Sequence, residues 1–568
     1  MICAPHGWEG IQCYQSVQRL GDALAAAGFH TVRVHYDGTG ESLGSDEEPG
    51  RVAAWLESVR RSIAALRRVR GVERVGVVAM RIGATLAATV AADEELGAMV
   101  LWEACVSGAH YTREMEILAS AAPAAIQEGR EARPGGVEAG GYLLTTETIT
   151  DLDALDLLKV KPRGKPDVLL VQRADRPPAF AKKLAEHLAR EGVTATLEQL
   201  PGHKEMMTYP ERSIPALGII TRIQEWAVER STIVPEPYAT DAGDANSAAE
   251  GSGIRASGEA TLSLSEHALA GRVRHRPVRF GPLGRLFGVI TEPADTAAAR
   301  PPFLFLTGGV VPRTGVNRMY VDMAARLAER GHTVLRMDVS GICESAPAEG
   351  AAPNDPHAAS LLDDVRGAVQ LLLDTTDQPT ISLMGLCSGA YATFQTALAD
   401  PRIKSAVLLN PEVFHLKDGS PKFSQTEQSQ AANYYRDQLF SAEAWKKLLS
   451  GKANVRYIAG FALAKAKTTV TTVRERISAR ITKVPQGLAG DLHRLITRGV
   501  DITIVMAEGD PGHAPLMSQL EADLDALRGM GFRLKLTPGP DHTFNDFSVR
   551  GPLVDWLVDV MAEAGARR

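Results

Sequence analysis

The feature of this 568-residue sequence that most constrains its fold is an internal repeat. Residues 28–42 (GFHTVRVHYDGTGES) align without gaps to residues 331–345 (GHTVLRMDVSGICES). The identical positions are Gly28, Arg33, Gly38, Glu41 and Ser42 in the first segment, and Gly331, Arg336, Gly341, Glu344 and Ser345 in the second. Three more pairs of segments match in the same order: 75–91 with 381–397, 167–175 with 502–510, and 200–206 with 537–544. Because chance does not produce four matches in one order, the repeat predicts two homologous halves.

Each half alternates short apolar runs of strand type with amphipathic runs of helical spacing. In the second half the expected strands are residues 302–309, 332–339, 380–386, 404–410 and 501–510. The expected helices are residues 320–330, 357–374 and 516–530. Because strands and helices alternate, each half is expected to be an α/β domain with a mostly parallel sheet and helices on both faces.

The length of the chain and one biased segment predict the domain boundaries. A chain of this length is too long for one ordinary domain. Residues 234–260 are rich in Ala, Gly, Ser and acidic residues and show no periodicity, which is typical of a flexible linker. The expected division is therefore a first domain at 1–230, a linker at 231–262 and a second domain at 263–568.

A turn in the second half carries a candidate nucleophile. Residues 385–389 (GLCSG) have the spacing G-x-S-x-G between a predicted strand and a predicted helix, with Cys387 at the serine position. Such a turn exposes its central side chain, and Gly385 and Gly389 meet its steric demand. The helix N-terminus beneath favours the reactive thiolate form. The alternative is that Cys387 is a small buried core residue, as free cysteines often are.

Two partners for this cysteine lie further along the chain. Asp510 follows the apolar strand at 501–507 and is the expected acid, with Glu508 as the less favoured choice because it falls two residues early. His542, in GPDHTF, is the expected base. The expected triad is Cys387, His542 and Asp510, with the aspartate fixing the imidazole tautomer. Oxyanion donors would be the backbone N–H of Ser388 and one N–H of the TGGV loop, at Gly309 or Val310.

These motifs, taken in chain order, resemble the α/β-hydrolase fold twice. The elements that match are a first strand with an HG-type loop, a second strand with a glycine-rich turn, the strand–elbow–helix, and a late Asp and His. The resemblance is to the serine-aminopeptidase-like group of bacterial acyl hydrolases, and it covers nearly the whole chain apart from the linker. It implies two α/β-hydrolase-like domains. The first half lacks a counterpart of the antiparallel hairpin expected at 278–293.

The elbow of the first half is degenerate. In AMRIG, residues 79–83, Arg81 occupies the nucleophile position. A guanidinium stays charged and cannot attack a carbonyl. Asp175 and His203 remain in register but have no nucleophile to activate. This half is therefore expected to be a non-catalytic copy.

Two roles are open for the residues of this degenerate site. Arg81 at a helix N-terminus beside His203 could hold a carboxylate or a phosphate. Alternatively it makes only a structural salt bridge. His6 and Trp8 belong to the former oxyanion loop and would line whatever pocket survives.

A basic insertion follows the second elbow. The segment from elbow to acid is 29 residues longer in the second half than in the first, and the excess falls in 415–495, where α/β-hydrolases carry a helical cap. From residue 446 to residue 483 there are ten Lys and Arg and one acidic residue. On an acidic protein this excess predicts a negatively charged partner, with Arg474, Arg476 and Arg480 as candidate contacts. The alternative is a solvated helix face.

Composition excludes several other classes of protein. A net charge of −6 gives no overall basic footprint, so nucleic acid is not expected as a partner. No apolar run reaches the roughly 20 residues needed to cross a bilayer, and the opening residues lack the pattern of a signal peptide. Five scattered cysteines without a C-x-x-C pair fit a reducing cytoplasm. No metal or cofactor motif is found, so neither is expected.

The expected function is acyl transfer. An elbow with cysteine at its centre is similar to the elbows of polyhydroxyalkanoate synthases, dienelactone hydrolases and acyl- or aminoacyl-shuttling enzymes. This resemblance implies a covalent thioester intermediate. The substrate would be an acyl ester or thioester, with a carrier protein or coenzyme A as candidate bearers of the acyl group. The enzyme would be an acyltransferase or a thioesterase/esterase. The competing class is a non-catalytic scaffold in which both halves are degenerate. Peptidase activity is suggested only by the name of the serine-aminopeptidase-like group.

Overall fold

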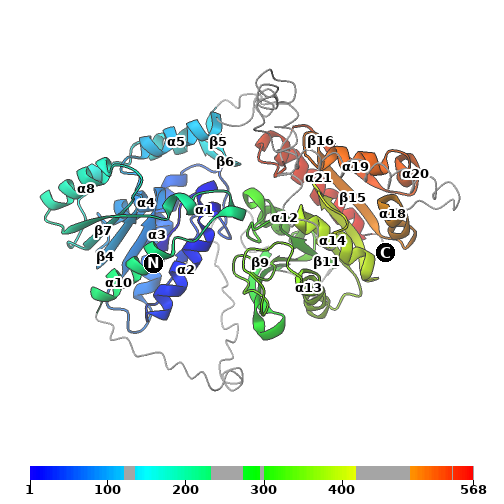
Figure 1. The fold of residues 1–568 in the computed structure, drawn as a ribbon, viewed down its shortest axis with the longest axis horizontal. Coiled ribbons are helices and arrows are strands. Elements are labelled where there is room, and N and C mark those ends of the chain that lie inside the picture. The colour runs from blue at the N-terminus through cyan, green and yellow to red at the C-terminus, as the bar shows by residue number, and fades with distance from the viewer. Residues whose placement is uncertain (121–134, 232–272, 295–299, 417–486, 540–541, 567–568) are drawn as a thin grey trace, which may run out of the picture.

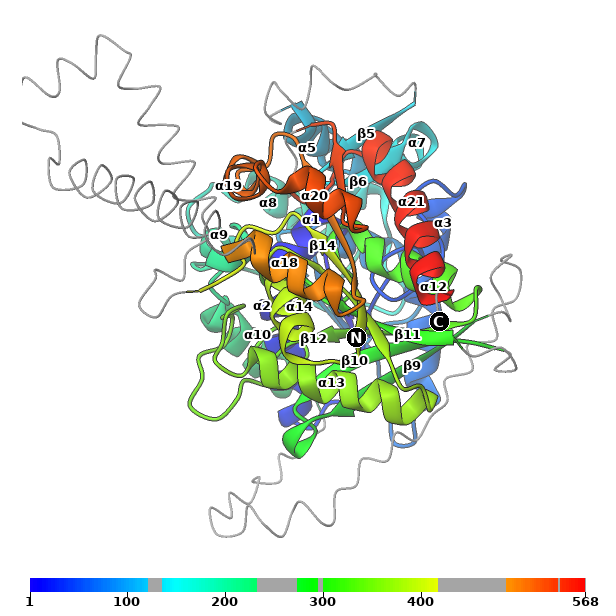
Figure 2. The same cartoon turned by 90° about the vertical axis from the view of Figure 1, so that its right-hand side faces the viewer.

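The computed structural model describes residues 1–120, 135–231, 273–294, 300–416, 487–539 and 542–566. They form two parts, each built around its own sheet (Figure 1). Residues 1–231 are called the N-terminal half below, and residues 273–566 the C-terminal half. Figure 2 shows the C-terminal half in front of the N-terminal half, with α18 and α13 toward the viewer. Within the described ranges no helix is both long and apolar enough to span a bilayer.

The N-terminal half has a six-stranded sheet in which every neighbouring pair is parallel. Its order is β2 (Arg33–Val34), β1 (Ile2–Cys3), β3 (Gly76–Met80), β4 (Ala98–Trp102), β7 (Asp167–Arg173) and β8 (Ala195–Leu200). A separate antiparallel hairpin pairs β5 (Gly136–Ala139) with β6 (Tyr142–Thr145). The helical segments are α1 (Trp8–Gln12), α2 (Tyr14–Ala26), α3 (Arg51–Arg67), α4 (Ile82–Val90), α5 (Gly108–Ser120), α7 (Thr146–Asp153), η1 (Leu157–Lys159), α8 (Ala179–Arg190), α9 (His203–Met206), η2 (Pro210–Arg212) and α10 (Leu217–Glu229).

Both faces of this sheet are covered, and the strand sequences show why. Successive side chains of β3 point to opposite faces, so Val77 packs in the core under α3, α4 and α8, while Val78 packs in the core under α2 and α10. In β4 the same alternation places Leu101 in the first of these cores and Trp102 in the second. Strands buried on both faces must be apolar at every position, which is why they read as continuous hydrophobic runs.

The C-terminal half has an eight-stranded sheet. Its order is β16 (Arg533–Thr537), β15 (Asp501–Ala507), β14 (Ile403–Leu409), β13 (Ile381–Leu386), β11 (Arg300–Leu306), β12 (His332–Asp338), β10 (Leu286–Pro293) and β9 (Val273–Phe280). The pairs β9–β10 and β10–β12 are antiparallel, and the other pairs are parallel. One face is covered by α13 (Leu361–Thr376), α14 (Ser388–Ala399), α18 (Gly487–Thr497), α19 (His513–Leu520) and α20 (Leu524–Gly529). The other face is covered by α12 (Met319–Ala328) and α21 (Phe547–Ala566), and 3-10 turns lie at η3 (Pro282–Gly284) and η4 (Val316–Arg318).

The expected fold class is confirmed. Both halves are α/β, and the six strands of the first sheet follow the same spatial order as β12-β11-β13-β14-β15-β16 of the second. The hairpin expected at 278–293 is present as β9 and β10. The expected helix at 516–530 is divided into α19 and α20, because residues 521–523 form a turn between them. The linker from 232 onward and residues 417–486 of the expected cap lie outside the described residues, so these boundaries stay predictions.

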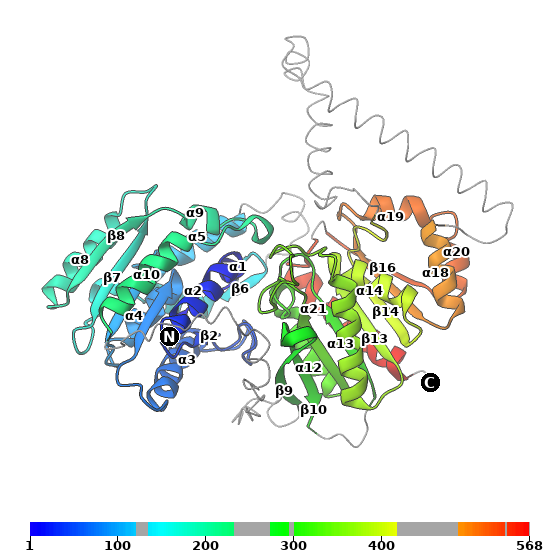
Figure 3. The ribbon, with the colours of Figure 1, turned by 60° about the horizontal axis from the view of Figure 1, so that its bottom comes forward.

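The two halves meet along the loops at the carboxyl ends of their strands. Figure 3 shows β6 of the N-terminal half and α21 of the C-terminal half at this boundary. There the Arg550 guanidinium donates a hydrogen bond of 2.9 Å to the carbonyl of Gly141. The Asn354 side chain donates another, of 3.3 Å, to the carbonyl of Pro210. The edge of the second sheet that carries Cys387 therefore faces toward the first half.

Candidate active site

Cys387 sits on a strained bend between β13 and α14. Its backbone has φ 53° and ψ −114°, a conformation that a residue with a Cβ rarely adopts. A Cβ on Gly385 would overlap the backbone of Gly389, and a Cβ on Gly389 would overlap the carbonyl of Leu306. The two glycines therefore let the strand, the bend and the neighbouring strand β11 pass one another. The side chain of Cys387 is half-buried.

His542 is held by a carboxylate at the end of the neighbouring strand. Its Nδ1 lies 2.5 Å from Oδ2 of Asp510, and Asp510 is buried. The second oxygen of Asp510 accepts the N–H of Gly512 at 2.7 Å. Asn410 fixes the loop of His542, since its amide donates to the carbonyl of His542 at 2.8 Å and accepts the N–H of Ala507 at 2.8 Å. The exposed Glu508 makes no such contact, so the imidazole pairs with Asp510.

The other side of the His542 ring meets the thiol. The ligand atoms of Cys387, His542 and Glu412 lie within 4.8 Å of one another. Burial alone lowers the pKa of His542, but the Cys387 sulfur and the Asp510 carboxylate outweigh it and hold that pKa well above its usual value. A protonated imidazole next to a thiol favours the thiolate–imidazolium pair. The arrangement can therefore provide a nucleophilic sulfur and a proton donor together.

Glu412 is a site residue that sequence reasoning missed. It is buried, and its Oε1 lies 3.8 Å from Nε2 of His542. The only signal in NPEVF is position: Glu412 stands three residues after β14, as Asp510 stands three residues after β15, so both fall at the same sheet edge. At this position the carboxylate faces the ring nitrogen that Asp510 does not hold, and it adds to the field that stabilises imidazolium.

The expected oxyanion loop lies beside the elbow, but one of its donors is engaged. The N–H of Gly309 donates to the hydroxyl of Ser388 at 2.9 Å. The N–H of Ser388 is among the unpaired donors at the start of α14. Val310 is buried, and its N–H has no acceptor among the described residues. Of the three expected donors, the N–H of Gly309 is therefore engaged, whereas those of Ser388 and Val310 have no acceptor among the described residues.

Cys343 is a core residue. Its thiol is buried against Val310 and Ile342 and lies 3.6 Å from the carbonyl of Val310. Burial raises its pKa well above the ordinary value, which disfavours the thiolate.

The first half has the same bend with different chemistry. Arg81 has φ 53° and ψ −126°, close to the values of Cys387. Its guanidinium lies 2.9 Å from Oε1 of Glu9 and also pairs with Glu114. Of the two roles considered for Arg81, the internal ion pair is the one that the structure contains.

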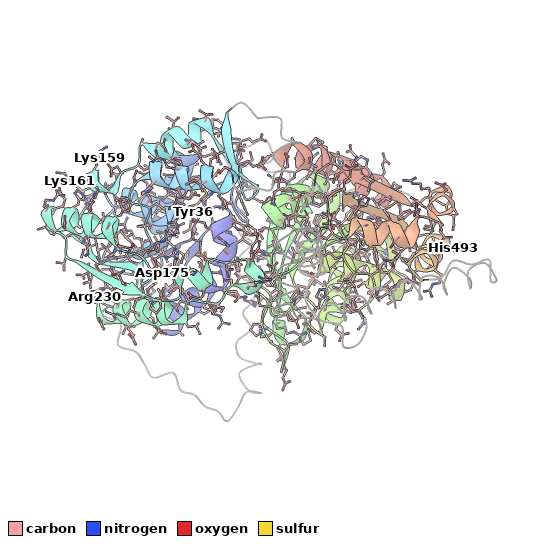
Figure 4. The ribbon with its side chains drawn as sticks, turned by 45° about the horizontal axis from the view of Figure 1, so that its top comes forward. Tyr36, Lys159, Lys161, Asp175, Arg230 and His493 are labelled. Carbon is pink, nitrogen blue, oxygen red and sulfur yellow. The ribbon has the colours of Figure 1, made fainter. Side chains whose placement is uncertain are left out.

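Asp175 and His203 are not brought together as Asp510 and His542 are. Both oxygens of Asp175 bond to Arg173, at 2.6 and 2.5 Å, on the exposed surface of the N-terminal half. Figure 4 labels Asp175 there, with Lys159, Lys161 and Arg230 at the outer end of that half. His203 is buried against Trp102, and its Nδ1 finds no hydrogen-bond partner in the described part of the chain.

The electrostatic surroundings of His203 are also opposite to those of His542. Burial, and then the nearby cation of Arg81, lower the pKa of His203 to about 3. This ring therefore stays neutral at ordinary pH. His6 packs against Trp55 with ring centroids 4.6 Å apart, and Trp8 stacks edge-on with Tyr209. Arg474, Arg476 and Arg480 lie outside the described residues.

Comparison with known proteins agrees with the fold. The family model described as "alpha/beta hydrolase fold" matches residues 301–448, the region that contains the elbow of Cys387. No curated protein matches the sequence significantly. The C-terminal half has the α/β-hydrolase fold.

The chain is also similar to several solved structures. One is a cold-adapted esterase from an Arctic intertidal metagenomic library, at 17% identity over 53% of this chain and 96% of that chain, with a TM-score of 0.29. Another is carboxyl esterase 2 of the mycorrhizal fungus Tuber melanosporum, at 16% identity over 53% and 88%, with a TM-score of 0.30. A third is an alpha-beta serine hydrolase homologue from Coxiella burnetii, at 14% identity over 51% and 97%, with a TM-score of 0.29.

The contacts of Cys387 predict selective alkylation. Iodoacetamide should modify Cys387 before the other four cysteines, because those are buried. His542→Ala should slow this reaction at neutral pH, since the sulfur loses the imidazolium that would stabilise its anion. Peptide mapping by mass spectrometry after timed labelling measures both effects. Equal labelling of all five cysteines would contradict the prediction.

The ion pairs of Arg81 predict a stability effect. Arg81→Ala leaves Glu9, whose side chain is only 12% exposed, without its cation and should lower the free energy of unfolding by about 3 kcal/mol. Arg61→Ala is the matched control, because its pair with Glu57 is exposed and should contribute less than about 1 kcal/mol. Urea unfolding of both variants measures the difference, and equal losses would refute the structural role of Arg81.

Proposed function

We propose that this protein is an acyl-transfer enzyme that works through a thioester on Cys387. His542 would serve as acid and base, and Asp510 would hold its tautomer. The single observation that carries the proposal is the position of the His542 ring, between the Asp510 carboxylate at 2.5 Å and the thiol on the elbow. A cysteine that only filled the core would require neither a strained backbone nor a histidine–aspartate pair beside it.

The first step would be attack on the acyl carbonyl. The proton of the thiol passes to Nε2 of His542, and the sulfur forms a bond to the carbonyl carbon while the carbonyl electrons move to oxygen. The N–H groups of Ser388 and Val310 would stabilise this oxyanion. When the carbonyl re-forms, the bond to the leaving group breaks, and His542 returns the proton to that group. The product is a Cys387 thioester.

The second step would move the acyl group to an acceptor. His542 takes a proton from an acceptor thiol, alcohol or water, whose sulfur or oxygen attacks the thioester carbonyl. Collapse of the tetrahedral intermediate expels the Cys387 sulfur. A thioester on the enzyme is well suited to exchange with another thiol or with an alcohol. We therefore favour an acyltransferase or thioesterase over a simple esterase.

We infer that the two halves are homologous domains, with chemistry only in the second. The proposed boundaries are 1–230, a linker at 231–262, and 263–568 with a helical cap near 415–495. The shared strand order and the matching bends at Arg81 and Cys387 support this division. Neither Arg81 nor the neutral His203 offers a nucleophile or a paired base.

The donor would be an acyl ester or thioester carried by an anionic partner in the cytoplasm. The basic run from residue 446 to residue 483 supports an acidic carrier protein or coenzyme A as that partner. The second candidate function is a non-catalytic scaffold. The hydrogen bond from the Gly309 N–H to Ser388 favours it, because it removes one expected oxyanion donor.

Replacing the nucleophile separates these two functions. Cys387→Ala should abolish turnover of a short acyl thioester and the acyl adduct seen by intact-protein mass spectrometry, with the thermal melt unchanged. Wild-type protein that forms no adduct with the thioester, under conditions where iodoacetamide reacts, would favour the scaffold. An alanine variant with near wild-type turnover would exclude Cys387 as nucleophile.

The serine variant tests the advantage of sulfur. In Cys387→Ser the hydroxyl is far less acidic than a thiol, so transfer to thiol acceptors should fall more than hydrolysis of activated esters. Comparing kcat for both reactions measures the split. Equal losses would show that the sulfur gives no special advantage in transfer.

The basic segment should govern docking of the donor. Reversing Arg474, Arg476 and Arg480 to Glu should raise KM for a carrier-bound or coenzyme A donor and leave kcat nearly unchanged. A small neutral thioester, handled equally by both proteins, is the control. Normal affinity for the charged donor at low salt would show that these arginines form only a solvated surface.

A further inference from the structure

Two glutamates at matched positions of the repeat reach across the boundary between the halves. Glu41, in the N-terminal half, lies 3.0 Å from Nε of Arg313 and 2.8 Å from a terminal nitrogen of Arg336. Glu344, in the C-terminal half, lies 2.5 Å from Arg33 and accepts the hydroxyl of Tyr14 at 2.5 Å. Each acid is therefore bound by two side chains of the other half.

The two clusters are reciprocal. Glu41 aligns with Glu344 in the repeat, and Arg33 aligns with Arg336. The contact of Arg33 with Glu344 is thus repeated, with the halves exchanged, by Arg336 and Glu41. Such exchange of partners is the property of an interface between two subunits related by a twofold axis. The halves meet as the subunits of such a dimer would.

The cluster around Glu41 is the more deeply buried of the two. Arg336 is completely buried and Arg313 nearly so, whereas the side chain of Arg33 keeps 30% of its exposure. Burial alone raises the pKa of Glu41, but Arg336 and then Arg313 outweigh it and lower that pKa to about 2. Glu41 is therefore ionised throughout the physiological range. Without the charge of Glu41, Arg313 would keep its pair with Asp338 at 2.9 Å, but the buried Arg336 would have no ion pair among the described residues.

Arg313 links this cluster to the candidate oxyanion loop. It follows Val310 by three residues, and its own N–H donates to Asp338 at 2.7 Å. Further along the same segment, Arg318 donates to carbonyls of the N-terminal half at Gly40, Ser42 and Gly44. The loop from Gly308 to Arg318 is therefore held by the turn that carries Glu41.

A second contact brings the N-terminal half to the loop itself. Tyr14 packs against the small cluster formed by Val310, Ile342 and Cys343. On the other side, a Cβ built on Gly309 would lie 2.8 Å from a carboxylate oxygen of Glu211. The N-terminal half thus lies beside both residues expected to supply the loop's oxyanion donor.

We propose that the N-terminal half completes the catalytic site as a fused, non-catalytic partner subunit, and that Glu41 is a positioning residue for the oxyanion loop. Glu41 acts through Arg313, whose ion pairs fix the path of the loop that bears Gly309 and Val310. This inference rests on the proposed acyl transfer at Cys387. It assigns to the first half a role that its own degenerate elbow cannot supply.

The test is the rate of acylation in Glu41→Gln. Removing a whole oxyanion donor costs roughly 100- to 1,000-fold in kcat, so displacing the loop should lower the single-turnover acylation rate about tenfold or more. KM should change little, because the substrate does not touch Glu41. Glu344→Gln is the matched control: it removes the charge that pairs with Arg33 at the same boundary, its amide oxygen can still accept the hydroxyl of Tyr14, and the ion pair of Arg313 with Glu41 is untouched. It should acylate within about twofold of wild type.

Two further measurements, hydrogen exchange and the Glu41→Asp variant, complete the test. Hydrogen exchange in a peptide spanning residues 307–313 should speed up in Glu41→Gln and not in Glu344→Gln, whether or not the enzyme turns over. Glu41→Asp keeps the negative charge, so it should recover part of the acylation rate lost in Glu41→Gln. If Glu41→Gln does not fold, Glu41→Asp is compared directly with wild type. Equal acylation and exchange in the two Gln variants, or no recovery in Glu41→Asp, would overturn the proposal. Wild-type protein that forms no acyl adduct would instead refute acyl transfer itself.

Discussion

The bend between β3 and α4 in the first half, and between β13 and α14 in the second, is the constraint on which the rest of each half depends. At Cys387 and Arg81 the backbone turns with φ 53°, and this places one side chain above the carboxyl edge of the sheet. The bend requires a glycine two residues later, because a Cβ on Gly389 or Gly83 would overlap the backbone of the neighbouring strand. The position two residues before is less strict, since Ala79 stands there in the first half and the bend persists.

The side chain on the bend influences the pKa of the histidine in each half. In the second half burial alone would lower the pKa of His542, but the sulfur of Cys387 and the carboxylate of Asp510 raise it, which favours a protonated imidazole beside the sulfur. In the first half a guanidinium at the same place contributes to lowering the pKa of His203 to about 3 and attracts Glu9 and Glu114 instead. One backbone geometry therefore supports two opposite charge arrangements.

The parts of the site set by chain order were predictable, and those set by long-range packing were not. Cys387, Asp510 and His542 follow strands in a known sequence, and strand ends of a parallel sheet share one edge. Glu412 escaped notice because nothing in NPEVF tells whether its carboxylate turns toward the histidine or into solvent. The partners of Arg81 lie 72 and 33 residues away, and the hydrogen bond from Gly309 to the Ser388 hydroxyl spans 79, separations at which no periodicity links two residues.

The pairing of Glu41 and Glu344 gives a reason why the two halves can differ so much within one chain. In a homodimer every substitution appears in both subunits, so a change that ends chemistry at one elbow ends it at both. In a fused chain the halves vary independently while the boundary that joins them is kept. The reciprocal pairs retain matched positions, yet one cluster uses Arg313 where the other uses Tyr14. The deeper cluster is the one beside the loop of the half that carries Cys387 on its bend. If acyl transfer proceeds at Cys387 as proposed, an inactive first elbow would cost no catalysis so long as the first half still supplies Glu41 to the second.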